Sequence, residues 1–228
     1  MVLNRMKKEV NMKLVTFQTE DALKVLQKDG VLKANPDYMD LQKYGVPYDW
    51  IVAEMKKRKI LPEYSEQYPL WAWAKCGSSV GPRKKKNINH ITQKLVKIVF
   101  EKPEDEVLLS DYMAYSFILS GQIVPKNKKE YSIFLKQMEN RGISLEDLKK
   151  SVRHQKTNVP INEIKKSWGR IFDFKSYIYQ ACVWNIKAED VKKIEILDDA
   201  NYLYGSMNAK RKDGSRPDWK KKYLKFLK

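Results

Sequence analysis

Four short runs of apolar and aromatic residues set the strongest limit on the folds that are open to this chain. Each run has the β-branched, aromatic or alternating character that is typical of a strand. The runs lie at residues 14–19, 68–73, 95–100 and 180–186. Stretches with apolar residues at helical spacing separate them. This interleaving predicts a mixed α+β fold.

Local signals refine the positions of several elements. Thr19 can cap a helix that starts directly after the first run, and Gly30 can end it in the left-handed conformation. A helical hairpin is expected near 126–156, and a last strand is expected at 191–197. These signals place helices and strands in alternation along most of the chain.

The length of 228 residues fits one domain of ordinary size. We expect a single α+β domain over 13–208 and a basic C-terminal tail or helix over 209–228. The tail holds nine Lys or Arg and two Asp, which gives a net charge of +7. Met12 stands just before the first predicted strand and is an alternative to Met1 as the natural start.

The charge balance favours an anionic partner. Forty-five Lys and Arg against 28 Asp and Glu give a net charge of +17 at pH 7. A nucleotide, a nucleic acid or an acidic protein would each fit such a surface. Lysine also accumulates in the proteins of AT-rich genomes without selection for binding. Charge alone therefore leaves the partner open, and it does not address the oligomeric state.

Membrane insertion, export and metal binding are not expected. The longest apolar-looking stretch, 107–124, contains five polar residues, and no run reaches the roughly 18–20 residues that span a bilayer. The N-terminus lacks the apolar core of a secretory signal, which predicts a cytoplasmic location. Cys76, Cys182, His90 and His154 are too scattered for a zinc site, and Cys182 fits a small core residue.

Several aromatic-rich blocks in fixed order resemble those of one family. The blocks are YPLWAW at 68–73, VLLSDYMAYSFILS at 107–120, WGRIFDF at 168–174 and QACVWNIKAEDVKKIE at 180–195. They resemble a family of bacterial and phage proteins that is known only as a domain of unknown function. The resemblance covers most of 13–197 and implies no activity.

A second resemblance implies a fold and a cofactor. LVTFQTEDALKVLQKDGVL at 14–32 and QACVWNIKAEDVKKI at 180–194 resemble the opening and closing segments of ADP-ribosyltransferase-like domains. That resemblance implies two small, mostly antiparallel sheets around a cleft, flanking helices, an inserted hairpin near 126–156, and NAD as cofactor. Active members use an early His or Arg and a late Glu, and these positions fall here on Gln18 and Gln180. Because Gln can bond a ribose hydroxyl but cannot act as a base, catalysis stays an open question.

The resemblance and the residue types together nominate one catalytic residue and eight ligand-binding residues. Gln180 would orient the ribose, and Gln18 and Arg170 would hold the phosphates or ribose. An indole would face the base. The ligand-binding candidates are Gln18, Thr19, Tyr68, Trp71, Trp73, Ser110, Trp168 and Arg170.

Most of these candidates have a structural alternative. Thr19 and Ser110 fit helix N-caps, because a side-chain oxygen there can accept from the first turn. Trp71 and Trp73 point to one side of a strand and fit an aromatic core. Arg170 fits a salt bridge.

Two functions are therefore expected. The first is a nucleotide-binding ADP-ribosyltransferase-like domain that transfers ADP-ribose from NAD to a protein or a nucleic acid. It predicts that Gln18 and Gln180 lie in near-neighbour strands at one cleft, within roughly 20 Å. The alternative is a non-enzymatic basic protein of phage or mobile-element type. Such a protein would capture nucleic acid, a nucleotide signal or an acidic protein, with 209–228 at its binding surface.

Overall fold

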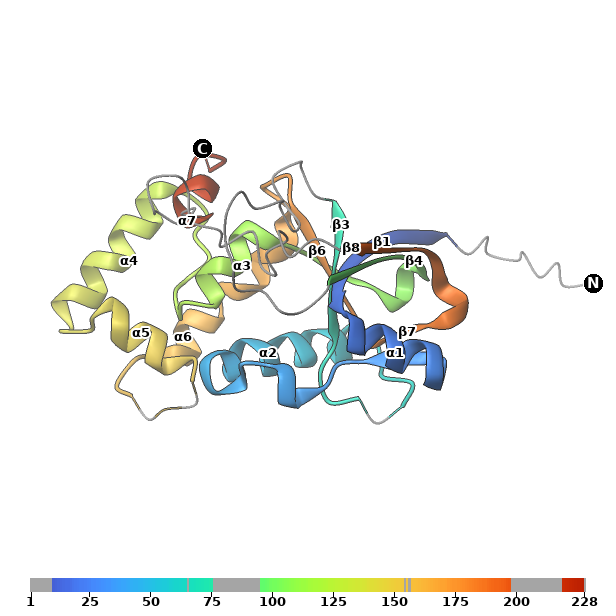
Figure 1. The fold of residues 1–228 in the computed structure, drawn as a ribbon. Coiled ribbons are helices and arrows are strands. Elements are labelled where there is room, and N and C mark those ends of the chain that lie inside the picture. The colour runs from blue at the N-terminus through green and yellow to red at the C-terminus, as the bar shows by residue number, and fades with distance from the viewer. Residues whose placement is uncertain are drawn as a thin grey trace, which may run out of the picture.

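The computed structural model describes residues 10–64, 66–75, 95–153, 155, 157–197 and 219–227. Helices and strands occur together along the chain, which confirms the α+β class (Figure 1). The strands are β1 (Asn11–Thr19), β2 (Val31–Lys33), β3 (Leu70–Lys75), β4 (Leu95–Pro103), β5 (Leu108–Asp111), β6 (Tyr179–Val183), β7 (Asn185–Lys187) and β8 (Val191–Leu197). The helices are α1 (Glu20–Asp29), α2 (Leu41–Lys57), α3 (Tyr112–Ile118), α4 (Lys128–Asn140), α5 (Leu145–Ser151), α6 (Ile161–Lys165) and α7 (Trp219–Tyr223). Short 3₁₀ turns are η1 (Pro36–Tyr38), η2 (Glu104–Glu106), η3 (Trp168–Asp173) and η4 (Ala188–Asp190).

The main sheet has six antiparallel strands in the order β5–β6–β3–β1–β4–β8, and β2 pairs with β7 in a second sheet. β1 pairs with β4 along its whole length, from Asn11 opposite Pro103 to Thr19 opposite Leu95. The antiparallel two-sheet prediction is thus confirmed. The main sheet is larger than the small sheet that was expected, because β5 joins β6 and β8 joins β4 at its two edges.

Apolar residues cover both faces of the main sheet, because successive side chains of a strand point to opposite sides. On one face Trp71 and Cys182 pack with Tyr115 of α3, and we call this the helical face. On the other face Ala72 and Ala181 pack with side chains of α1 and β2, and we call this the α1 face. Figure 1 shows α3, α4, α5 and α6 gathered to one side of the sheet, with α1 near the small sheet.

The predicted helical hairpin near 126–156 is confirmed by α4 and α5 (Figure 1). Asn127 caps α4 by accepting a hydrogen bond from the backbone N–H of Glu130 at 2.8 Å. Ser144 and Asp147 form a capping box at the start of α5, where each side chain accepts from the other's backbone N–H. Local side-chain oxygens therefore fix where both helices begin.

The boundaries of α1 also follow the local sequence. Thr19 Oγ1 accepts from the backbone N–H of Ala22 at 3.2 Å, so Thr19 is the predicted N-cap. Gly30 follows the helix with φ 72° and donates its N–H to the carbonyl of Leu26. Helix α1 therefore leads from the central strand of the main sheet directly into β2.

The cap of α3 differs from the expected one. The Asp111 carboxylate accepts from the backbone N–H groups of Met113 at 3.0 Å and Ala114 at 3.1 Å. Ser110 is still part of β5, and its hydroxyl accepts a hydrogen bond from another strand. The helix therefore begins one residue later than a Ser110 cap would require.

The end of the basic tail packs against the helices. Within α7 and the residues after it, Tyr223 and Leu227 are buried, with 1% and 5% of their surface exposed. The Tyr223 ring meets Phe117 of α3 edge-on, with centroids 5.7 Å apart. Residues 219–227 are therefore anchored in the helical core, and 209–218 lie outside the described residues.

The described residues bear on two expectations from the sequence, one on membrane-spanning helices and one on the cysteines and histidines. None of the helices formed by the described residues has the length and apolarity needed to cross a bilayer. Cys182 is fully buried, as predicted. Cys76, His90 and His154 lie outside the described residues.

Candidate functional site

A row of three predicted site residues crosses neighbouring strands on the helical face. The register places Ser110 of β5 opposite Gln180 of β6, and Gln180 opposite Trp73 of β3. Gln180 is buried, and its Nε2 donates to Ser110 Oγ at 3.0 Å. Three residues from distant parts of the sequence are thereby held side by side.

A second row lies two residues further along the same strands. It consists of Leu108, Cys182 and Trp71, which lie opposite one another in β5, β6 and β3. Burial raises the pKa of the Cys182 thiol well above its ordinary value, which keeps the thiol neutral. Trp71 and Trp73 are both partly exposed, so solvent reaches this part of the helical face.

Tyrosines of α2 and α3 lie against the two indoles. Tyr115 meets Trp71, and Tyr112 meets Trp73, with ring centroids 5.1 Å apart in each pair. Tyr48 of α2 meets Trp71 edge-on at 6.1 Å. We call Trp71, Trp73, Tyr48, Tyr112 and Tyr115 the aromatic face.

Tyr68 extends this aromatic face toward the surface. Its ring meets Tyr48 edge-on, with centroids 6.1 Å apart. Its hydroxyl donates to Asp49 Oδ1 at 3.1 Å, and burial together with that carboxylate raises the pKa of Tyr68. Tyr68 is therefore brought close to the two predicted tryptophans.

Two buried donors on the aromatic face lack a hydrogen-bond acceptor among the described residues. They are Nε1 of Trp71 and Oη of Tyr115. Tyr115 is 4% exposed, and burial, with smaller effects of Tyr48 and Cys182, raises the pKa of its hydroxyl well above the usual value. An unsatisfied buried donor costs about 1–3 kcal/mol. The face thus contains two neutral donors, one N–H and one O–H, that have no acceptor among the described residues.

The Asp111 carboxylate connects α3 to the segment that leads into β6. It accepts from both the backbone N–H and the hydroxyl of Ser176, at 2.6 and 2.7 Å, in addition to its two bonds to α3. Burial raises the pKa of the Asp111 carboxyl, although these donors oppose the shift. The carboxylate fixes α3, with Tyr112 and Tyr115, relative to Gln180.

Gln18 does not join the aromatic face. The register pairs Val15 of β1 with Trp73, so Val15 lies on the helical face. Gln18 is three residues further along and therefore points to the α1 face, where its Nε2 donates to Thr16 Oγ1 at 2.8 Å. Gln18 and Gln180 lie in one sheet, as predicted, but β3 separates their strands and they do not face one cleft.

Trp168 and Arg170 lie in η3, within the helical layer. Trp168 is fully buried, and its Nε1 donates to the carbonyl of Gln122 at 2.9 Å. Arg170 donates to both carboxylate oxygens of Glu130 at 3.0 and 2.9 Å, and to the carbonyl of Val124 at 2.8 Å. Trp168 is therefore a core residue, and the structural alternative of a salt bridge describes Arg170.

Sequence reasoning missed the three tyrosines of the aromatic face. Tyr112 and Tyr115 are three residues apart and come shortly after Ser110, and this spacing places them on one side of a helix. That signal was available in the sequence. Tyr48 carries no such signal, because only the packing of α2 on β3 brings it to Trp71.

Metal chemistry has no support in the part of the chain that the structure describes. No group of three or more His, Cys, Asp or Glu side chains is placed there to hold a metal ion.

Comparison with known proteins gives a family without an assigned activity. The model of a family described as a domain of unknown function (DUF3841) matches residues 13–192. No curated protein and no solved structure matches the chain. The matched segment contains the aromatic face together with Gln180 and Ser110. Because the match spans well over half of the chain, the protein belongs to the DUF3841 family.

Proposed function

We propose that the aromatic face binds a nucleotide through its heteroaromatic ring, with NAD as the ligand of first choice. The observation that supports this most is the pair of buried donors, Trp71 Nε1 and Tyr115 Oη, without an acceptor among the described residues. The carboxamide oxygen of nicotinamide, or a keto oxygen of a base, would supply that acceptor.

Other features of the same face support the proposal. The partly exposed rings of Trp71 and Trp73 can contact a flat heterocycle, since aromatic rings attract one another edge-to-face or in offset stacks. Gln180 adds an amide beside them, held by Ser110. The net charge of +17 favours a ligand that carries phosphates.

The first prediction is that NAD raises the melting temperature of the protein, and that Tyr115→Phe weakens this binding about threefold to tenfold. Loss of one neutral hydrogen bond has an effect of this size. Stability should not fall in Tyr115→Phe, because the hydroxyl has no partner among the described residues. Thermal shift and calorimetry with NAD, ADP-ribose and AMP would measure both quantities.

Tyr131→Phe is the matched control. The Tyr131 hydroxyl donates to Gln122 Oε1 at 3.2 Å, away from the aromatic face. This variant should lose stability and keep its nucleotide affinity, the reverse of Tyr115→Phe. If no nucleotide stabilises the parent protein at concentrations up to the millimolar range, the proposed function is wrong.

Binding has more support here than transfer of ADP-ribose. Position 180, which the transferase resemblance would fill with a carboxylate, holds an amide that bonds Ser110. An amide cannot bring negative charge to a developing oxocarbenium ion, and this absence of charge favours a binding site over a catalytic one.

The second prediction uses Gln180→Glu. We expect this change to weaken NAD binding by about tenfold or more and to release no nicotinamide, because the new charge is buried and faces an anionic ligand. Gln180→Ala should weaken binding less, since it removes a neutral group. Calorimetry and a nicotinamide-release assay would compare the three proteins. Turnover by Gln180→Glu would instead favour the transferase function.

A further inference from the structure

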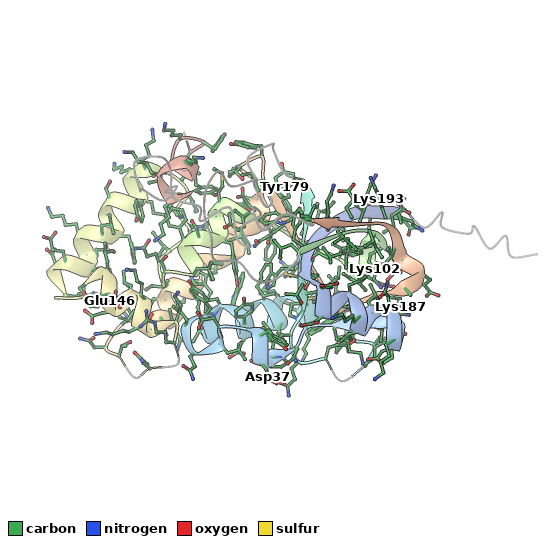
Figure 2. The ribbon with its side chains drawn as sticks, in the orientation of Figure 1. Asp37, Lys102, Glu146, Tyr179, Lys187 and Lys193 are labelled. Atoms are coloured by element: carbon green, nitrogen blue, oxygen red, sulfur yellow. The ribbon has the colours of Figure 1, made fainter. Side chains whose placement is uncertain are left out.

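A second set of aromatic side chains lies exposed where α7 meets the start of β6. Phe174, Tyr177 and Phe226 have 37%, 43% and 41% of their surface exposed. Phe174 meets Tyr179 with ring centroids 5.1 Å apart, and Tyr177 meets Phe226 at 5.5 Å. Figure 2 labels Tyr179, at the start of β6. We call Phe174, Tyr177, Tyr179 and Phe226 the aromatic corner.

The chain holds these rings at the surface in two different ways. Tyr223 and Leu227 are buried in the helical core, and this anchor leaves Phe226 between them exposed. Phe174 has φ 49° and ψ 52°, the left-handed conformation that non-glycine residues rarely adopt. Such a backbone costs about 1 kcal/mol or more, and it is tolerated here for a side chain that remains partly exposed.

Lysines flank the aromatic corner. Lys175 follows Phe174 and Lys225 precedes Phe226, and both are exposed. One acidic neighbour, Asp173, is also exposed beside Phe174. Exposed rings between basic residues are the combination that binds single-stranded nucleic acid, in which unpaired bases stack on aromatic rings and lysines contact phosphates.

We infer that the aromatic corner binds single-stranded nucleic acid. The bases of a duplex are stacked inside it and cannot reach the rings, so the corner selects single strands. Base stacking does not depend on sequence, and binding is accordingly sequence-tolerant. The corner is separate from the aromatic face, so this inference does not depend on the proposed nucleotide site.

The test is fluorescence anisotropy with a labelled single strand of about 12 nucleotides, in DNA and RNA form, against the duplex of the same sequence. Phe174→Gly and Tyr177→Ala should each weaken single-strand binding by about tenfold. Phe174→Gly also removes the left-handed strain, so its melting temperature should hold or rise while binding falls. Misfolding therefore cannot explain the loss.

Matched variants separate stacking from general charge. Tyr38→Ala removes a ring that is 88% exposed on η1 and should leave binding unchanged. Lys225→Gln should reduce the slope of log affinity against log salt by about 0.7. Equal binding of the duplex, equal binding of Phe174→Gly and the parent, or capture of an acidic peptide in place of the single strand would each overturn the inference.

Discussion

Gly121→Ala is expected to lower the free energy of unfolding by about 3 kcal/mol or more, close to the range where single substitutions become exceptional. Gly121 follows α3 with φ 65°, and an added Cβ would lie 2.0 Å from the carbonyl oxygen of Leu148 and 2.9 Å from Ser151 Oγ. Both residues belong to α5. Because the closest atom is backbone, α5 would have to move away from the end of α3. Urea unfolding followed by circular dichroism would measure the loss.

Two other glycines serve as controls for the backbone conformation itself. Gly30 and Gly142 have φ 72° and 66°, close to that of Gly121, but an added Cβ would meet nothing within 4 Å at either position. Gly30→Ala and Gly142→Ala should therefore cost only the left-handed penalty of about 1–2 kcal/mol. If all three variants lose the same stability, the close approach of α3 and α5 has no energetic weight and the prediction is wrong.

The sequence predicted elements whose signals are local. Thr19 and Gly30 bound α1, and the hairpin near 126–156 follows from caps and apolar stripes within a few residues. The last strand, β8, spans residues 191–197, which is the range that the sequence predicted. In each case the residues that form the signal also make the contact, so nothing from elsewhere in the fold was needed.

The relation between Gln18 and Gln180 could not be predicted in this way. Both strands were expected in one sheet, and they are in one sheet. The face on which each side chain lies depends on the register through β3, where Val15 lies opposite Trp73 and Trp73 lies opposite Gln180. A shift of the pairing register by one residue would turn Gln18 to the other face of the sheet. That register joins strands that lie far apart in the sequence, so it is known only from the folded structure.

Site residues whose contacts lie far away in the sequence could not be assigned for the same reason. Trp71, Trp73, Ser110 and Gln180 were found because strand-like runs or a strand end carry them, and adjacent strands brought them together. Arg170 was ambiguous, since its partner Glu130 lies 40 residues away on α4. Side chains whose role depends on such a partner can be assigned only from the folded structure.

Lys102 is a buried cation that connects the main sheet to the small one. Its side chain is 4% exposed, and Nζ lies 2.8 Å from Asp190 Oδ2 and 3.4 Å from Glu106 Oε2. It also donates to Asn185 Oδ1 of β7 at 3.2 Å. Figure 2 shows Lys102 near Lys187, on the side of the sheet where β7 lies. Burial of a charge is tolerated here because acceptors from three other segments surround it.

Lys102→Met is expected to destabilise the protein by about 3–5 kcal/mol, since removing one member of a buried ion pair leaves the other charge uncompensated. Met has nearly the same shape as Lys, so no cavity forms. The loss of stability therefore measures the lost contacts with Asp190 and Asn185. Lys187→Met is the control, because Lys187 forms an ion pair with Glu63 at 2.8 Å, but the two side chains are 30% and 50% exposed, far more than Lys102. Exposed pairs contribute little, and this variant should unfold at nearly the same urea concentration as the parent. Equal stability of Lys102→Met and Lys187→Met would mean that water reaches Lys102 and that the two sheets are joined by their apolar contacts alone.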